Sequence, residues 1–184
     1  MATTFPGTTI EVSTLSQGSS RILFDGIFAT GGITLSQVSV MTGLEPYLIQ
    51  NWVKRGFVSP PMKRVYSREQ FARIVLINML RETLQIERIC HLLELMGATT
   101  ETPDDDWIGD ADLYHRYVDM LADPSLRISD GASVLKAAES TISEFEERIP
   151  HTKRKLVQIL QVLFYAHSAS RLRRSAEDVL ATLD

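Results

Sequence analysis

The chain has 184 residues, of which 44% are hydrophobic and 23% charged, with a formal net charge of −4. This composition excludes collagen-like and wholly disordered chains and allows a buried core. The only cysteine, Cys90, excludes an intrachain disulfide. Residues 1–20 lack the pattern of a signal peptide, and no apolar run reaches the roughly 18 residues that cross a membrane. We therefore expect a cytoplasmic protein with no membrane partner.

Charge is segregated along the chain. Residues 45–73 hold six basic residues against two acidic ones, whereas residues 97–147 hold thirteen acidic residues against three basic ones. Net charge is a poor guide to partners when charges of one sign gather in one segment. The overall acidity therefore does not exclude a nucleic-acid-binding segment around residues 45–73.

Residues 1–20 are rich in Thr, Ser and Gly without a lasting period, which predicts a flexible arm. Residues 21–28 are apolar enough to dock on the domain that follows. Thr34 and Gln37 have the spacing of a capping box and predict a helix over 35–42, ended by Gly43. Pro46 suits the first turn of the next helix. Two short helices with a glycine in the turn predict a helix-turn-helix, whose second helix enters the major groove.

The second helix has two faces. Helical spacing turns Leu48, Ile49, Trp52 and Val53 inward and leaves a polar stripe on the opposite side. That stripe consists of Tyr47, Gln50, Asn51 and Lys54. Gln and Asn can bond adenine through two hydrogen bonds, and Lys can bond guanine or phosphate. We predict that the stripe contacts DNA; the alternative is a solvated helix face.

After Gly56, Phe57-Val58 and Val65-Tyr66 flank a segment with two prolines, which predicts a small two-stranded ribbon or a tight loop with cations near its tip. Ser67 and Gln70 form a second capping-box signature, opening an apolar helix over 68–82, and a further helix is expected over 86–96. The full set of predicted DNA-binding residues is Tyr47, Gln50, Asn51, Lys54, Arg55, Lys63, Arg64 and Arg68. For Arg68 and Arg73 a role as surface charges is an equal alternative.

Residues 98–106 form a polar, acidic connector and the predicted boundary between a domain at 21–97 and an α-helical region at 107–184. In that region we expect helices over 110–122 and 129–149. The buried side of the second would hold Val134, Leu135, Ala138, Ile142, Phe145 and Ile149. A further helix begins near Thr152, and the sequence leaves open whether residues 151–184 make one helix or two.

The remaining polar residues show no catalytic pattern. The four histidines are scattered without metal-ligand spacing, and the run at 104–106 is better explained as a solvated loop than as a metal site. No phosphate-binding loop, nucleophile elbow or paired-carboxylate arrangement occurs. We therefore expect no enzyme activity, no cofactor and no metal. A second basic set is assigned to a partner for the acidic region rather than to DNA: Lys153, Arg154, Lys155, Arg171, Arg173 and Arg174.

The run from Thr34 to Leu93 resembles the bacterial family called domain of unknown function 1836, which is similar to the DNA-binding domain of MerR-type transcriptional regulators. The resemblance rests on the helix end Asn51-Trp52-Val53-Lys54, the prolines of the wing, the Tyr66-Ser67-Arg68-Glu69 opening of the next helix and the segment Ile86 to Ile89. It implies a winged helix-turn-helix and DNA binding. Many MerR regulators place an arginine before paired tyrosines where this chain has Gln50 before Asn51-Trp52. No metal-binding cysteines follow, so metal or drug sensing is not expected.

These observations predict an all-α protein: a winged helix-turn-helix with a small β wing, followed by a C-terminal helical bundle. The predicted function is that of a sequence-specific DNA-binding transcriptional regulator acting on double-stranded DNA. A homodimer is expected because one short recognition helix specifies few base pairs. The C-terminal region would serve dimerisation or an effector, small molecule or protein, that the sequence does not identify. The alternative is a protein-interaction module that keeps the scaffold but binds DNA weakly or not at all.

Overall fold

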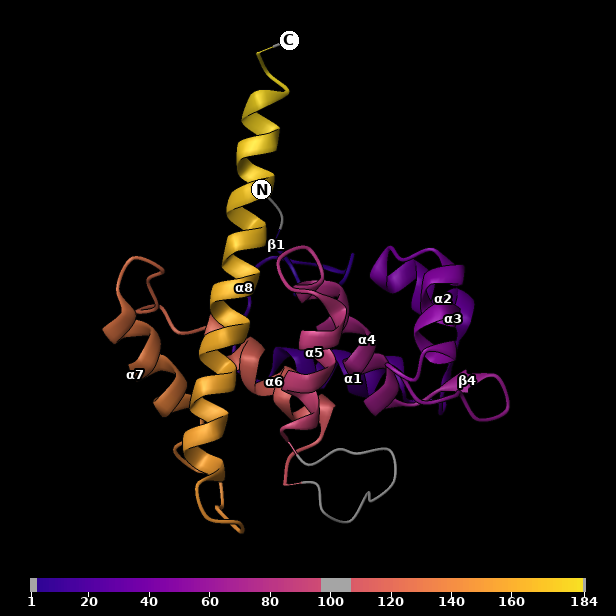
Figure 1. The fold of residues 1–184 in the computed structure, drawn as a ribbon, viewed down its shortest axis with the longest axis horizontal. Helices are drawn as coiled ribbons and strands as arrows, with labels where there is room; N and C mark the ends of the chain where they lie inside the picture. Colours follow the sequence, from indigo (N-terminus) through magenta and orange to yellow (C-terminus); the bar gives the residue numbers. More distant parts are fainter. Residues whose placement is uncertain (1–2, 97–106, 184) are drawn as a thin grey trace.

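The computed structural model describes residues 3–96 and 107–183. The chain is mostly helical, with two small antiparallel sheets (Figure 1). The connector predicted at 98–106 lies outside the described residues. The elements in order are β1 (Thr3–Thr4), β2 (Glu11–Val12), α1 (Ser19–Ile27), β3 (Ile33–Thr34), α2 (Leu35–Thr42), α3 (Pro46–Lys54), β4 (Val65–Tyr66), α4 (Arg68–Leu80), α5 (Ile86–Glu94), α6 (Asp110–Leu121), α7 (Gly131–Thr141) and α8 (Thr152–Leu180).

The N-terminal segment differs from the flexible arm expected over 1–20. Its described part forms a hairpin of β1 and β2 and then begins α1 at Ser19. Phe5 is buried, and the carbonyls of Pro6 and Gly7 accept hydrogen bonds from the Tyr114 hydroxyl at 2.9 Å and the Asn78 amide at 2.9 Å. These partners lie far along the chain, so local composition gave no sign of them.

Both predicted capping boxes are present. The Thr34 hydroxyl accepts from the Gln37 amide at the start of α2, and Ser67 does the same for Gln70 at the start of α4. Gly43 has φ of 69°, and its amide donates to the carbonyl of Ser39, which ends α2 as expected. The bounds of α2 therefore agree with the prediction, and α4 ends two residues before the predicted Glu82.

The expected ribbon has a different partner. β4 pairs with β3, with Ile33 opposite Tyr66, rather than with Phe57-Val58. Pro60 and Pro61 cannot donate to a ladder. The Gln70 side chain instead donates to the carbonyls of Ser59 and Pro60 at 2.8 and 2.9 Å and fixes this arm. The segment from Phe57 to Tyr66, called the hairpin from here on, therefore closes only at its tip, through a bridge between Met62 and Val65.

Helix α4 lies at the centre of the molecule. It contacts α2 on one side and α6 and α8 on the other. This explains why it is apolar nearly all round, with Phe71, Ile74, Leu76 and Leu80 fully buried. Tyr114 and Tyr117 of α6 belong to the same cluster of buried residues. The region predicted to begin at 107 thus shares one continuous core with residues 21–96.

The helix expected over 129–149 is shorter. α7 runs from Gly131 to Thr141, and the chain then turns so that the Phe145 ring lies 6.0 Å from the Trp107 ring and 5.2 Å from the guanidinium carbon of Arg116. Asp130, not Ser129, caps the helix by accepting from Ala132. Two residues expected to be buried, Leu135 and Ile149, are 40% and 45% exposed.

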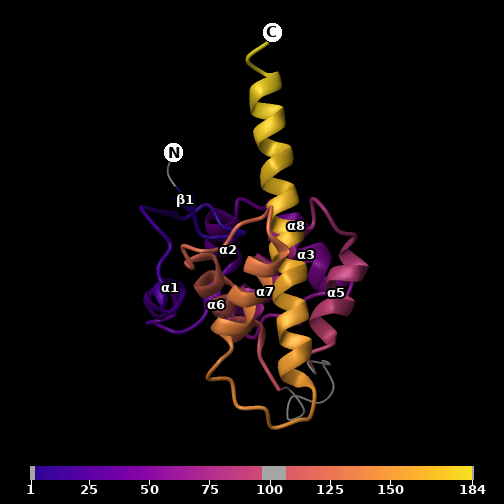
Figure 2. The ribbon, with the colours of Figure 1, turned by 90° about the vertical axis from the view of Figure 1, so that its left-hand side faces the viewer.

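The question left open for 151–184 is settled by α8, which is one helix through Ser168-Ala169-Ser170. The Ser170 hydroxyl donates to Glu82, and Thr83 donates to the carbonyl of Ala166 at 3.2 Å, so this part is held against the body. Beyond it the helix projects past all other described elements (Figures 1 and 2).

Candidate nucleic-acid interface

Helix α3 presents the polar stripe predicted from the sequence. Ile49 and Trp52 are buried under it, and Leu48 and Val53 pack at its edges. The four stripe residues Tyr47, Gln50, Asn51 and Lys54 are all exposed. Among the described residues no hydrogen bond, ion pair or ring contact engages any of these four side chains. The stripe is therefore a row of donors and acceptors with no partner among residues 3–96 and 107–183.

The local sequence fixes the direction of α3. Pro46 occupies its first turn, where no amide donor is needed. Gly56 has φ of 78°, and the amide of Phe57 returns to the carbonyl of Trp52 at 2.9 Å, which closes the helix. The buried Trp52 then sets which face points outward.

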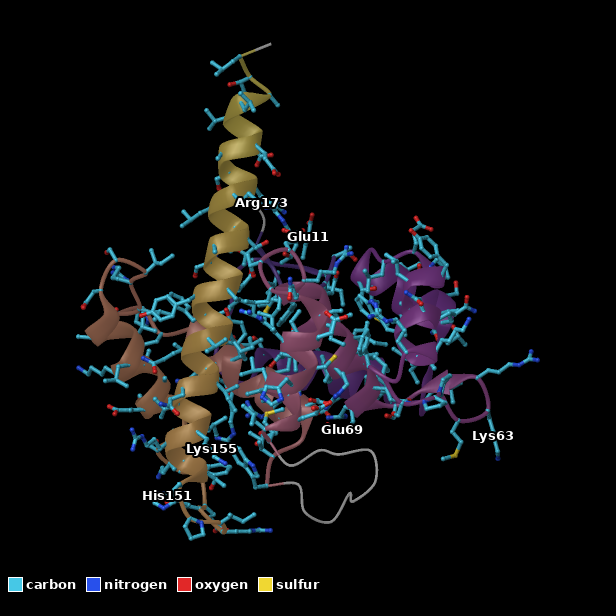
Figure 3. The ribbon with its side chains drawn as sticks, in the orientation of Figure 1. Glu11, Lys63, Glu69, His151, Lys155 and Arg173 are labelled. Carbon is cyan, nitrogen blue, oxygen red and sulfur yellow. The ribbon has the colours of Figure 1, made fainter. Side chains whose placement is uncertain are left out.

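The hairpin tip places two cations in an unusual backbone conformation. Lys63 and Arg64 have φ of 50° and 66°, and the amide of Val65 donates to the carbonyl of Met62 at 3.0 Å. A two-residue turn with both φ positive favours Asn and Gly, so Lys and Arg there cost roughly 1 kcal/mol or more each. Both side chains are exposed, and Lys63 points away from the body (Figure 3).

Sequence reasoning did not single out Met62, which is 77% exposed at the same tip. The hairpin and α3 lie at the same end of the molecule, far from α7 (Figure 1). Six of the eight predicted residues are therefore exposed on elements at this end of the molecule: Tyr47, Gln50, Asn51, Lys54, Lys63 and Arg64.

The other two predicted residues are engaged within the chain. Arg55 pairs with Glu87 at 2.8 Å, and its guanidinium carbon lies 4.4 Å from the centre of the Phe57 ring. Arg68 pairs with Asp25 of α1 at 2.7 Å. Both pairs are partly exposed and are worth about 1 kcal/mol or less. These contacts distinguish Arg55 and Arg68 from Lys63 and Arg64 of the tip, whose side chains have no partner among the described residues.

Arg73 is not a surface charge. It binds Asp110 at 2.7 Å, and the two side chains are only 13% and 8% exposed. Two other acidic residues of α6 are also paired with arginine: Asp112 with Arg116, and Asp119 with Arg21. The three acidic residues of α6 therefore form ion pairs within the chain.

Two arginines of the second basic set bind an acidic residue that lies outside the acidic region 97–147. Arg173 and Arg174 both bind Glu82, which follows α4, at 2.9 and 2.7 Å. The Arg174 hydrogen bond holds the pKa of Glu82 at about 2, well below its ordinary value. This cluster ties α8 to the body.

Two histidines bond to hydroxyl groups inside the fold, His115 buried and His167 half-buried. The Nδ1 of His115 lies 2.9 Å from the Ser20 hydroxyl, and that of His167 lies 2.8 Å from the Tyr117 hydroxyl. Burial lowers the pKa of each to about 4, and nearby arginines act in the same direction. Within residues 3–96 and 107–183, no cluster of His, Cys, Asp and Glu has the make-up of a metal site.

Residues 33–117 match the family model described as Domain of unknown function (DUF1836). The match covers β3 through most of α6, so it includes α3, the hairpin and the Arg73–Asp110 pair. It agrees with the resemblance seen in the sequence and extends it into α6.

No curated protein and no solved structure matches the chain. Among the helices that the structure describes, none has the length and apolar character needed to cross a membrane.

Proposed function

We propose that this protein is a sequence-specific DNA-binding transcriptional regulator in which α2, α3 and the hairpin act as a winged helix-turn-helix on double-stranded DNA. In this proposal α3 enters the major groove, where Gln50 and Asn51 contact base edges and Lys54 contacts phosphate or guanine. Lys63 and Arg64 contact the phosphate backbone beside it. The regulator works in the cytoplasm as a homodimer.

The observation that carries the proposal is the hairpin tip. Strained backbone conformations persist where function needs them, and here two exposed cations stand on a strained turn with no partner among the described residues. A polyanion that binds both cations would offset the free-energy cost of holding them in this strained turn. The free polar stripe on α3, at the same end, supplies the groups that distinguish base pairs.

Selection from a random-sequence duplex library tests the proposal. We expect the protein to enrich a defined sequence and to bind it at least roughly 1,000-fold more tightly than random DNA at the same salt concentration. Gln50→Ala should relax the preference at one position, at a cost of about 1–3 kcal/mol, because it removes a base contact.

Lys136→Ala is a matched control, since Lys136 is exposed on α7 at the far end of the molecule. It should leave the enriched sequence and the affinity unchanged. Failure to enrich any sequence, together with binding equal to that of random DNA, would contradict the proposal and favour the protein-interaction module.

A further inference from the structure

A cavity of about 910 Å³ lies where the N-terminal strands meet α8. Its walls come from the β1–β2 segment (residues 3–15), the end of α2, the C-terminal part of α4, residues 121–124 and α8. Sites that bind small metabolites commonly have volumes of roughly 300–1,000 Å³. The cavity therefore has room for a metabolite, and its walls come from segments that lie far apart in the sequence.

The β1–β2 segment supplies hydroxyl groups to the wall. Four residues of this segment line the cavity with hydroxyls that make no hydrogen bond among the described residues, namely Thr3, Thr4, Ser13 and Thr14. Asn78 joins the segment to α2, because its side-chain amide donates to the carbonyls of Gly7 and Thr42 at 2.9 and 3.0 Å. The fold thus holds a set of free hydrogen-bonding groups against the cavity.

His167 adds a hydrogen-bond donor to the same cavity. Its Nδ1 lies 2.8 Å from the hydroxyl of Tyr117, which is fully buried and has no other partner among the described residues. A buried hydroxyl proton without an acceptor is costly, so Tyr117 donates to Nδ1 and the neutral ring carries its proton on Nε2. Nε2 has no partner within residues 3–96 and 107–183, yet no buried side-chain nitrogen there is left unpaired, so it is accessible from the cavity that its ring lines.

Arg171 supplies a free positive charge to the wall. Two other charged residues of the wall are already engaged. The Asp123 carboxylate accepts from the amide and the hydroxyl of Ser125 at 2.8 and 2.7 Å, and Arg174 belongs to the ion-pair cluster that ties α8 to the body. The guanidinium of Arg171 makes no hydrogen bond or ion pair among the described residues. It follows His167 by one helical turn, on the same face of α8, and lowers the pKa of that histidine.

We propose that the cavity binds a small organic phosphate, whose phosphate group accepts hydrogen bonds from Arg171 and from Nε2 of His167. The planar guanidinium matches phosphate oxygens in pairs. A phosphate monoester offers three such oxygens, so it can also accept from the hydroxyls of the β1–β2 segment. Because a phosphate group fills only a small part of the cavity, the remaining volume holds the hydroxyl-bearing body of the ligand. This binding does not depend on DNA.

Titration with inorganic phosphate, followed by NMR, tests the site. The reporter is the Cε1 proton of His167, whose signal is identified by its loss in His167→Gln. In the full chain at neutral pH without DNA, phosphate should shift this signal saturably, with a Kd on the order of 1 mM for so small a probe. Arg171→Gln should weaken binding at least roughly tenfold, because a charge-assisted hydrogen bond is lost, and should keep the wild-type melting temperature. Arg88→Gln is the matched control, since Arg88 is exposed on α5 without an ion pair among the described residues, and it should bind phosphate as the wild type does.

The absence of a saturable shift in the wild type at roughly ten times that concentration, or equal affinity in Arg171→Gln, overturns the proposal. Acetate offers fewer oxygens and less charge, so it should bind less tightly than phosphate, and equal or tighter binding of acetate overturns the choice of phosphate. Lys54→Ala with Lys63→Ala removes cations of the proposed DNA surface and should leave the shift at His167 unchanged. Loss of the shift in that double variant overturns the site, whereas failure of phosphate to bind leaves the DNA-binding proposal standing.

Discussion

The two ends of this molecule expose opposite kinds of side chain. At one end α3 and the hairpin present polar and cationic groups that have no partner in the part of the chain that the structure describes. At the other, α8 projects with leucine and valine outward. The stripe of α3 lies on a helix whose other face is buried, whereas every residue of α8 from Arg171 to Leu180 is exposed. The difference teaches that the first surface suits a charged, hydrated ligand, whereas the second does not.

The largest loss of stability is expected where α4 contacts α6. Arg73→Met leaves the carboxylate of Asp110 buried without its guanidinium, which should lower the free energy of unfolding by about 3–5 kcal/mol. Urea unfolding followed by circular dichroism measures this. Arg68→Met, which breaks a half-exposed pair, should cost about 1 kcal/mol or less. Equal losses in the two variants would show that α4 and α6 are not coupled through this pair.

Acid should lower the stability of the fold through two histidines, one on α6 and one on α8. His115 and His167 have pKa values of about 4 in the folded protein, below the ordinary 6.5, so the unfolded chain binds protons that the folded chain does not. Stability should be constant above about pH 6.5 and fall between pH 6.5 and 4, by up to about 1.4 kcal/mol per pH unit for each histidine.

The pH dependence of urea midpoints measures this effect, and His115→Gln should remove part of the slope. A slope unchanged in His115→Gln would contradict the assignment of this buried histidine as neutral. The fall that comes from Glu82 lies in a lower range, between about pH 4.5 and 2, because the pKa of this carboxyl drops from an ordinary 4.5 to about 2 in the folded chain.

A smaller change, and a gain in stability rather than a loss, is expected at the hairpin tip. The double substitution Lys63→Asn with Arg64→Gly supplies the residues that a turn with two positive φ angles favours. It should raise the free energy of unfolding by about 1–2 kcal/mol. The same change should weaken DNA binding, because both cations are gone. A variant that is more stable and binds DNA as well as the wild type would remove the hairpin from the interface.

Much of the region from α2 to α4 could be predicted because its signals are local. The capping residues Thr34 and Ser67, the glycine that ends α2 and the buried Trp52 all act within a few residues of their own position. The exposed stripe of α3 followed from spacing alone. The β4 partner did not, because β3 lies about thirty residues earlier and two residues carry little strand pattern.

Features set by distant contacts were missed. Nothing near Arg55, Arg68 or Arg73 in the sequence names Glu87, Asp25 or Asp110 as partners, so free and paired arginines looked alike. The end of α7 depends on Phe145 meeting Trp107, and the order of residues 3–20 depends on Tyr114 and Asn78. The exposure of Leu172, Val179 and Leu180 was not predicted either, because only the fold shows that the body leaves this part of α8 uncovered.

The most direct test of the central claim is the salt dependence of binding to any duplex DNA, compared between the wild type and Lys54→Ala with Lys63→Ala. Each phosphate contact adds about 0.9 to the slope of log affinity against log salt. The slope of the double variant should be smaller by about 1.8, whereas Lys136→Ala should keep the wild-type slope. A wild-type slope near zero, or an unchanged slope in the double variant, would contradict the proposal that α3 and the hairpin bind DNA.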